Sequence, residues 1–375
     1  MRIAHVINAL RVGGAEKLLV TLAGELRRRG IDFTIITLRQ SDPEMLALAA
    51  AEGARIAEFP HRKLWAPRRF YRLERYLRAE RFSVLHTHLT MANILGAAAG
   101  RLAGTPVVTS LHNTTMRSQS LPLHHLAETW LLRTSVRRII AVGWETARTQ
   151  GARLKGRQML VLPNAVPCPE PLTPDERRAL RRELGGGAPE APLLIFVGRL
   201  VPQKGLGDLL LAFAGVQRHH PAARLLVVGD GPLQGEVQAQ AQSLGLGEQV
   251  RLLGLRGDVP RLLGACDLFV SAAHWEGLPV ASLEAMAAGL PLAVTAVGDL
   301  PRVVTPETGA LTPPHAPELL AEAINALLSA PARLAAAGAA AQQRARREFS
   351  AGAWAGRLLD LYDEVRQEEA HAGAR

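Results

Sequence analysis

Residues 1–37 read MRIAHVINALRVGGAEKLLVTLAGELRRRGIDFTIIT, and this stretch decides the fold class. Residues 3–7 form an apolar run typical of a buried strand. Residues 16–29 carry the apolar spacing of an amphipathic helix, and residues 33–37 form a second apolar run. A strand, a helix and another continuous apolar strand in this order predict a βαβ unit in a parallel sheet.

The same alternation continues along the chain and then restarts after a break. Further strands are expected at residues 83–87, 106–110, 193–197, 224–228, 267–271 and 292–295, with a small-residue helix near 93–99. The break contains five prolines between Pro163 and Pro174, which is typical of a linker. The sequence therefore predicts an α/β protein with two Rossmann-like domains, joined near residues 165–190, with ligands expected in the cleft between them.

Length and composition exclude several classes of protein. The 375 residues fit two domains, and the 48% hydrophobic content is too high for a disordered chain. No apolar run approaches the roughly 20 residues of a membrane span, and the first residues lack the features of a signal peptide. Two cysteines, Cys168 and Cys266, exclude a disulfide framework. We expect a cytoplasmic protein, with peripheral attachment to the inner face of the membrane as a further option.

The positive charge is concentrated in the first half of the chain. The net charge is +10, yet residues 1–170 hold 25 basic and 12 acidic side chains. Arginines recur through residues 68–81 on one face of an expected helix, and four of them are candidates to face an anionic membrane: Arg68, Arg69, Arg72 and Arg75. A solvated amphipathic helix is an equally good interpretation. Nucleic acid is not expected as a partner, because no recognition motif accompanies the charge.

The second domain contains two motifs with candidate chemistry. A loop after the strand 193–197 holds Gly198, Arg199 and Lys204, which places two cations where the negative charge of a departing diphosphate would develop. Glu276 and Glu284 flank an expected helix start, where backbone amides can face an anion. The carboxylates can accept hydrogen bonds from hydroxyl groups, although solvated acids at a helix end are common. Gly229 lies in a further turn at a strand end. This turn alone fits close approach of a ligand and a purely structural turn equally well.

The first domain offers histidines and glycines at strand ends. His86 and His88 alternate along a strand, so they share a face. With no obvious third ligand, a polar-substrate role is favoured over zinc. His112 and Asn113 follow the next strand, and Gly14 opens the first helix without completing a dinucleotide-binding fingerprint.

Taken in order, these motifs resemble the retaining glycosyltransferases of family 4, which have the GT-B fold. The matching segments are Gly13–Glu16, His86–His88, Leu111–Asn113, Pro163–Val166, Val197–Gly205, Val228–Pro232 and the pair of Glu276 with Glu284. The resemblance spans nearly the whole chain. It implies an acceptor-binding domain over residues 1–165, a donor-binding domain over 166–352, and a terminal helix near 353–375 that packs on the first domain.

The resemblance also implies the reaction and the roles of individual residues. A sugar would pass from a nucleotide-sugar, by family frequency a UDP-sugar, to a glycan or lipid-linked acceptor, with retention and without a cofactor or an obligatory metal. The implied donor contacts are Gly14, Gly198, Arg199, Lys204, Gly229, Glu276, Gly277, Leu278, Pro279 and Glu284. Of these, Arg199, Lys204 and Glu276 would act in catalysis together with His112. His86, His88 and Asn113 would lie on the acceptor side.

Three departures from the family pattern keep other functions open. Asp299 stands where a glycine is common, Arg302 where an acid is common, and Gly143 where a serine is common. A nucleotide-sugar 2-epimerase with the same architecture would convert the donor without an acceptor. A catalytically degenerate partner subunit would retain the fold without transfer.

Overall fold

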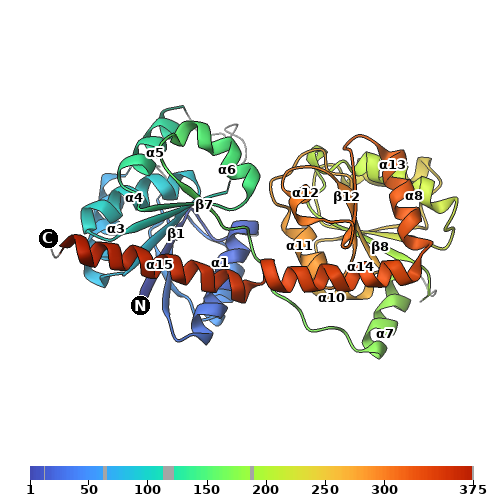
Figure 1. Ribbon diagram of the computed structural model, residues 1–375, viewed down its shortest axis with the longest axis horizontal. Helices are drawn as coiled ribbons and strands as arrows, with labels where there is room; N and C mark the ends of the chain where they lie inside the picture. The colour runs from blue at the N-terminus through green and yellow to red at the C-terminus, as the bar shows by residue number, and fades with distance from the viewer. Residues whose placement is uncertain (12, 62–65, 113–121, 186–189, 374–375) are drawn as a thin grey trace. The chain divides into compact units, whose positions relative to one another are not determined.

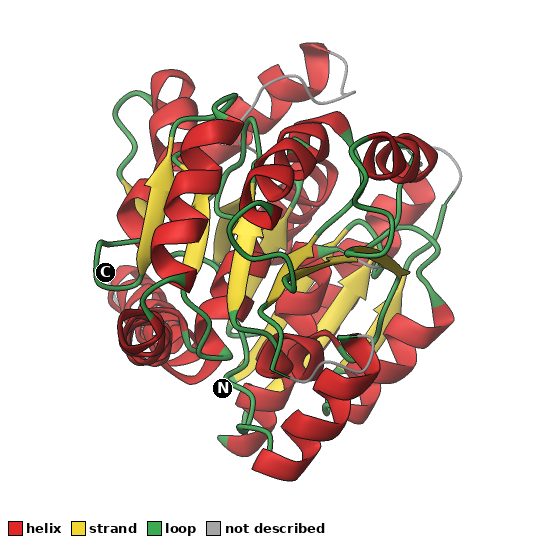
Figure 2. Cartoon of the chain, turned by 90° about the vertical axis from the view of Figure 1, so that its right-hand side faces the viewer, coloured by secondary structure: helices red, strands yellow, loops and turns green. Residues whose placement is uncertain are grey.

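The structure is a computed structural model that describes residues 1–11, 13–61, 66–112, 122–185 and 190–373. These residues divide into two compact units. Unit 1 comprises Met1–Ala165 and Ala351–Arg375, and unit 2 comprises Val166–Ser350. In each unit the strands of one parallel sheet lie between layers of helices (Figure 2).

The described part of unit 1 contains a seven-stranded parallel sheet in the order β3-β2-β1-β4-β5-β6-β7. Its strands are β1 (Arg2–Ile7), β2 (Asp32–Thr37), β3 (Arg55–Glu58), β4 (Val84–His88), β5 (Val107–Leu111), β6 (Arg138–Ala141) and β7 (Met159–Val161). Its helices are α1 (Gly14–Arg28), α2 (Pro43–Ala51), α3 (Pro67–Glu80), α4 (Thr90–Ala103), α5 (Pro122–Thr134), α6 (Trp144–Gly151), the 3₁₀ turn η1 (Ala152–Leu154) and α15 (Ala351–Gly373).

The described part of unit 2 contains a six-stranded parallel sheet in the order β10-β9-β8-β11-β12-β13. Its strands are β8 (Leu193–Val197), β9 (Arg224–Val228), β10 (Val250–Gly254), β11 (Leu268–Ser271), β12 (Leu292–Thr295) and β13 (Gly309–Thr312). Its helices are α7 (Pro174–Leu184), η2 (Pro202–Lys204), α8 (Leu206–Gln217), α9 (Gln234–Ser243), α10 (Val259–Ala265), α11 (Val280–Ala287), α12 (Leu300–Val303), α13 (Pro317–Leu328), α14 (Pro331–Arg344) and the π-helical segment η3 (Ala345–Phe349).

The alternation of side chains along the strands produces a core on each face of the sheet. In β1, Ile3 and Ile7 join one apolar cluster, and Ala4 and Val6 join the cluster on the opposite face. All strand pairs are parallel, so every strand of a sheet ends at the same edge. This carboxyl edge is where ligands bind in open α/β sheets.

The terminal helix α15 covers one face of the sheet in unit 1 and packs beside α1 (Figure 1). Trp354, Leu358 and Tyr362 are buried in the same cluster as Ile3 and Ile7. Each of these positions is four residues from the next, which is a spacing that puts them on one helical face.

The proline-rich segment differs from the expected linker, because it contains helix α7. Thr173 and Glu176 form a reciprocal capping box, and Pro174 occupies the first turn, where its missing N–H costs nothing. The sequence Thr-Pro-Asp-Glu was the readable signal for this helix start. Proline density alone therefore gave a wrong prediction for residues 173–184.

The arginine-rich helix α3 confirms one part of its predicted pattern and contradicts another. Leu73 and Leu77 are buried, whereas Arg68, Arg72 and Arg75 are exposed. Arg69 is 6% exposed, and its Nη1 donates to the carbonyl oxygen of Leu38 at 3.0 Å. Burial and the nearby Arg39 lower the pKa of Arg69. The prediction that Arg69 faces a membrane is therefore wrong.

Across the described residues, no single helix is long and apolar enough to cross a membrane. One bent pair of helices, Pro317–Leu328 with Pro331–Phe349, is long and apolar enough when the two helices are taken together, by length and composition alone.

Candidate active site

The carboxyl edge of unit 2 brings together the two charged motifs. Lys204 at the end of η2 forms an ion pair with Glu276, and both side chains are largely buried, at 17% and 11% exposed. Gln203 Nε2 donates to the Glu276 carboxylate at 3.2 Å and to the carbonyl oxygen of Trp275 at 2.9 Å. The loop after β8 and the loop after β11 are therefore joined by side-chain contacts.

Gly205 explains how Lys204 reaches Glu276. Its φ of +60° lies in the left-handed region, and an added Cβ would collide with the carbonyl oxygen of Ala272. The backbone of the lysine loop thus lies directly against the loop that carries Glu276, and the amide of His274 donates to the carbonyl oxygen of Gln203 at 2.9 Å. Only glycine permits this approach without strain.

The glycines of the strand-end turn after β9 have a structural reason. Gly229 has φ +135°, and a Cβ there would collide with the carbonyl oxygen of Gly198. A Cβ at Gly231 would meet the backbone of Leu200 in the same way. The amide of Leu200 donates to the carbonyl oxygen of Asp230 at 2.9 Å. Two backbones therefore lie in contact here, and this turn fixes the loop on which exposed Arg199 stands.

Helix α11 begins immediately after the Glu276 loop, as the sequence predicts. Its N-cap is Pro279, which makes no side-chain capping bond, and in the first turn the amide of Ser282 donates to the carbonyl oxygen of Pro279 at 3.2 Å. The positive end of the helix dipole favours an anion at this N-terminus. Gly277, Leu278 and Pro279 are half-buried. Glu284 lies in the second turn and is half-buried. The arrangement thus combines a lysine, an arginine, two carboxylates and a helix N-terminus.

The segment with the sequence departures at residues 299 and 302 begins against the Glu276 loop. Gly298 has φ +55°, and its Cβ would collide with the carbonyl oxygen of Gly277. The buried Asp299 donates its amide to that same oxygen at 2.9 Å. Arg302 is exposed. Asp299 therefore contacts the Glu276 loop through its backbone amide.

Asp208, His274 and His315 form a group that the sequence did not indicate. His274 Nε2 lies 2.9 Å from Asp208 Oδ2, and His315 Nδ1 lies 3.7 Å from the same oxygen. The two imidazole rings lie 3.9 Å apart, and His315 has φ +58°, which is strained for a residue with a side chain. The three residues offer the carboxylate and imidazole donors that a metal ion can use.

At the carboxyl edge of unit 1, Gly14 is exposed at the start of α1. Gly13, the N-cap, has no side chain to cap the helix, and the carboxylate of Glu16 in the first turn accepts a hydrogen bond from its own backbone amide. Gly143 likewise caps α6 without a side-chain bond, because glycine has no side chain to supply one. Asn113 lies outside the described residues.

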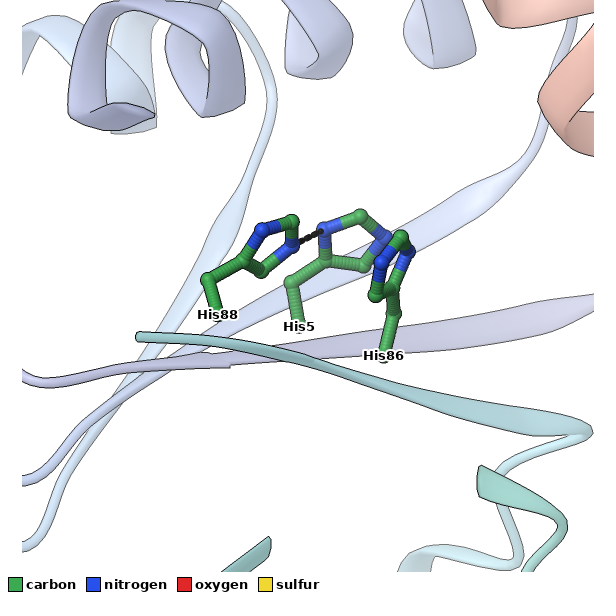
Figure 3. Close-up of side chains that lie close together, drawn as sticks. All are labelled: His5, His86 and His88. Carbon is green, nitrogen blue, oxygen red and sulfur yellow. Dashed lines mark hydrogen bonds between the residues drawn. The ribbon is translucent and has the colours of Figure 1, made fainter. Parts of the chain in front are cut away.

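A row of histidines crosses the sheet of unit 1 (Figure 3). His5 of β1 is the register partner of His86 in β4, and His88 follows two residues later on the same face. His88 Nε2 and His5 Nδ1 form a hydrogen bond of 2.9 Å, and His88 Nδ1 lies 3.0 Å from Nε2 of His112. Leu89, next in the chain, has φ +70°, a strained backbone that fixes the end of β4.

Burial keeps these histidines neutral. His5, His86 and His88 are at most 1% exposed, and burial lowers their pKa values well below the usual 6.5. Burial also lowers the pKa of half-buried His112 to about 4. The prediction that His86 and His88 face an acceptor is wrong for their side chains, because both lie inside the core of unit 1.

Comparison with known proteins identifies the class. A family model for glycosyl transferases group 1 matches residues 181–344, and a model for glycosyltransferase family 4 matches residues 12–169. The two models match successive parts of the chain, and the chain belongs to the glycosyltransferase family that they describe. The predicted resemblance is therefore confirmed.

Individual relatives agree with the family and with the fold. The chain is 29% identical to a putative glycosyltransferase, EpsF of Bacillus subtilis, over 93% of this chain and 90% of the relative. An Escherichia coli UDP-Gal:α-D-GlcNAc-diphosphoundecaprenol α-1,3-galactosyltransferase is 30% identical over 60% of each chain. The crystal structure of Anabaena HepE with UDP matches with a TM-score of 0.86 at 22% identity, covering 97% of this chain and 100% of HepE. The predicted GT-B fold is confirmed.

Proposed function

We propose that this glycosyltransferase moves a sugar from a UDP-sugar to a glycan or lipid-linked acceptor, with retention at the anomeric carbon and without a metal. The observation that carries the proposal is the Lys204–Glu276 pair at the carboxyl edge of unit 2. A cation that can meet a diphosphate is held there beside a carboxylate that can meet sugar hydroxyls.

Each charged group has a role that follows from its chemistry. Arg199 and Lys204 stabilise the negative charge that develops on the departing diphosphate. Glu276 accepts hydrogen bonds from sugar hydroxyls, with help from amides at Gly277 to Pro279, and Glu284 accepts those of the ribose. When a donor binds, Lys204 exchanges Glu276 for phosphate, which releases the Glu276 carboxylate for the sugar.

The turns and unit 1 supply backbone and neutral contacts. Gly198 and Gly229 hold the Arg199 loop and let a ligand approach the backbone. Gly14 brings the start of α1 to a donor phosphate. His112 is proposed to act at the reacting centre as a neutral group.

The nature of donor and acceptor is inferred from related proteins. HepE has been crystallised with UDP and with UDP-glucose, which favours a uridine nucleotide. The E. coli relative uses UDP-galactose and a diphosphoundecaprenol acceptor, which favours a lipid-linked acceptor.

We propose a front-face transfer. The bond between the anomeric carbon and the diphosphate oxygen breaks, and the acceptor oxygen bonds to the same face of that carbon. The acceptor proton passes to the departing diphosphate oxygen, so no covalent enzyme intermediate is needed. The protein contributes charge stabilisation and orientation to this step.

Metal independence is tested by removal. Because Asp208, His274 and His315 offer metal-ligand donors near the Glu276 loop, transfer is measured after treatment with EDTA and after adding back divalent ions. Undiminished transfer supports the proposal. Loss on chelation with recovery on metal addition overturns the metal-free mechanism.

We also propose that Arg68, Arg72 and Arg75 attract anionic lipid headgroups and so bring a membrane-embedded acceptor to unit 1. All three are exposed on α3, and Arg75 lies 5.8 Å from the ring centre of exposed Tyr71. The contact is electrostatic and weakens with salt.

The function is tested by combining nucleotide binding with product analysis. We expect a higher melting temperature with UDP than with GDP or ADP, because a ligand that binds only the folded state raises it. NMR of the product formed from an α-linked UDP-sugar and acceptor should show an α-linkage. A β-linked product overturns retention, conversion of donor without acceptor indicates an epimerase, and binding of no nucleotide indicates a degenerate subunit.

A further inference from the structure

A continuous chain of hydrogen bonds links the C-terminal helix to His112. Ser110 Oγ lies 2.8 Å from His86 Nε2, and His86 Nδ1 bonds to the hydroxyl of Tyr362. Tyr362 Oη lies 2.8 Å from His5 Nε2. From His5 the chain continues through His88 to Nε2 of His112, at 2.9 and 3.0 Å.

The chain is enclosed within the core of unit 1. Tyr362 and His5 are 0% exposed, and Ser110 is 4% exposed. The members come from β1, β4, β5, the residue after β5, and α15. Buried polar groups are costly unless each donor meets an acceptor, so the positions of the protons along this chain are constrained.

The chain does not have the geometry of a metal site, although His5, His86 and His88 lie close enough to be considered (Figure 3). Both nitrogens of each of these rings already have partners in the hydrogen-bond chain. The rings of His86 and His88 are stacked at 4.3 Å and 24°, so the in-plane lone pairs of the two rings lie in nearly parallel planes.

A neutral imidazole has one N–H donor and one acceptor nitrogen, so the protons must be ordered along the chain. The Tyr362 hydroxyl could accept from both His86 and His5, but its own buried proton would then have no acceptor in the chain. Two arrangements satisfy all the links and also use this proton. In one, every bond is donated in the direction from Ser110 to His112, and in the other every bond is reversed. Exchanging one arrangement for the other moves the proton of every ring to its other nitrogen.

The Ser110 end decides between the two arrangements. Within the described residues, His86 is the hydrogen-bond partner of the Ser110 hydroxyl. If His86 donated to Ser110, the buried hydroxyl proton would lack that acceptor. If Ser110 donates, its proton is satisfied and only lone pairs stay unused, which is the smaller cost. Donation therefore runs from Ser110 through His86, Tyr362, His5 and His88 to Nε2 of His112.

We propose that this chain fixes His112 in the tautomer with its proton on Nδ1, so that His112 presents an N–H donor to the substrate. Ser110, His86, Tyr362, His5 and His88 are positioning residues that act through His112. An N–H donor can bind a hydroxyl oxygen or an oxygen that gains negative charge. It cannot take up the proton that the hydroxyl group of the acceptor substrate loses during transfer. The role at the substrate rests on the function proposed above, whereas the tautomer does not.

The proposal is tested by NMR of full-length protein labelled with ¹⁵N-histidine. Two-bond proton–nitrogen spectra show which ring nitrogen is protonated, and loss of a signal in His112→Gln assigns His112. Wild type should show the Nδ1–H tautomer alone. Tyr362→Phe removes the central hydroxyl and should give a mixture of tautomers, whereas Tyr76→Phe, a half-buried tyrosine of α3, should match wild type. An Nε2–H tautomer of His112 in wild type overturns the proposal.

A second variant separates the chain from a packing effect. Ser110→Ala removes the group that sets the direction and leaves Tyr362 in place, so it too should give mixed tautomers. If either variant is folded and keeps the Nδ1–H tautomer alone, the proposal is wrong. In transfer assays, Tyr362→Phe should lower kcat at least tenfold and change KM less than threefold. If the spectra show the expected tautomers but the protein has no transfer activity, the proposed function is wrong, whereas the proposal on the tautomer of His112 still holds.

Discussion

The two carboxyl edges of this protein are built by opposite means. In unit 2, charged Lys204 and Glu276 meet on loops that glycines allow to lie in contact. In unit 1, the edge near His112 is supported by buried, neutral histidines linked to Tyr362. The difference shows that one sheet architecture can end in charged side chains on close-packed loops or in a buried, hydrogen-bonded row of neutral side chains. In the proposed function, the charged edge stabilises a leaving group, whereas the neutral chain orients a hydrogen-bond donor without adding charge.

The largest expected effect concerns the neutral histidines. An unfolded histidine has a pKa near 6.5, whereas burial holds the pKa of His112 at about 4 and those of His5, His86 and His88 well below 6.5. Between these values the unfolded chain binds more protons, so the stability falls as the pH decreases through that window. The expected slope is about 1.4 kcal/mol per pH unit for each such histidine.

Urea unfolding at pH 7, 6 and 5 measures this slope. His86→Gln should make it shallower, and His219→Gln, an exposed histidine of unit 2, should leave it unchanged. A free energy of unfolding that is constant from pH 7 to pH 5 would contradict the neutral network.

The next effect concerns the charged edge. Lys204→Ala removes a cation proposed to stabilise the departing diphosphate, and loss of one such group costs roughly 100- to 1,000-fold in kcat. Steady-state kinetics with UDP-sugar and acceptor measures the change. Lys155→Ala, at an exposed lysine, is the matched control. A loss smaller than threefold would remove Lys204 from the site.

The glycine that allows this charged edge gives a smaller effect. Gly205→Ala places a side chain at φ +60° and against the carbonyl oxygen of Ala272, so it should destabilise the protein by about 2 kcal/mol. Gly235→Ala, which has open space within α9, should be neutral or stabilising. Thermal unfolding compares the two, and equal melting temperatures would show that the close approach is unimportant.

The sequence predicted most of the charged edge and little of the neutral one. Lys204, Glu276 and Glu284 belong to short motifs next to strands, so local pattern was sufficient. The contact between His5 and His86 depends on β1 lying beside β4, and Tyr362 arrives from a helix 276 residues after His86. In the sequence, Tyr362 stands among the apolar positions of the expected terminal helix, and this pattern does not indicate its hydrogen-bond partners.

Two errors have similarly local causes. Arg69 is adjacent to exposed Arg68, yet a step of one residue along a helix turns it toward the core. In the linker, a capping box at Thr173 overrode the effect of the surrounding prolines. In both cases composition predicted the general character of the segment. The geometry of individual residues decided which side chain is buried and where a helix begins.

The smallest effect concerns α3. Arg68→Gln should weaken binding to vesicles with anionic lipid about fivefold, since one basic residue near such a surface contributes about 1 kcal/mol. Arg182→Gln, an exposed arginine of α7, should have no effect. Co-sedimentation at low and high salt measures both. Equal binding to neutral and anionic vesicles would contradict the electrostatic contact.

The central claim, that the charged edge of unit 2 holds the donor, is tested most directly by hydrogen exchange of the full-length protein with and without saturating UDP. Mass spectrometry should show slower exchange in peptides covering residues 198–205 and 276–284. Protection confined to unit 1, with residues 198–205 and 276–284 unchanged, would contradict the claim.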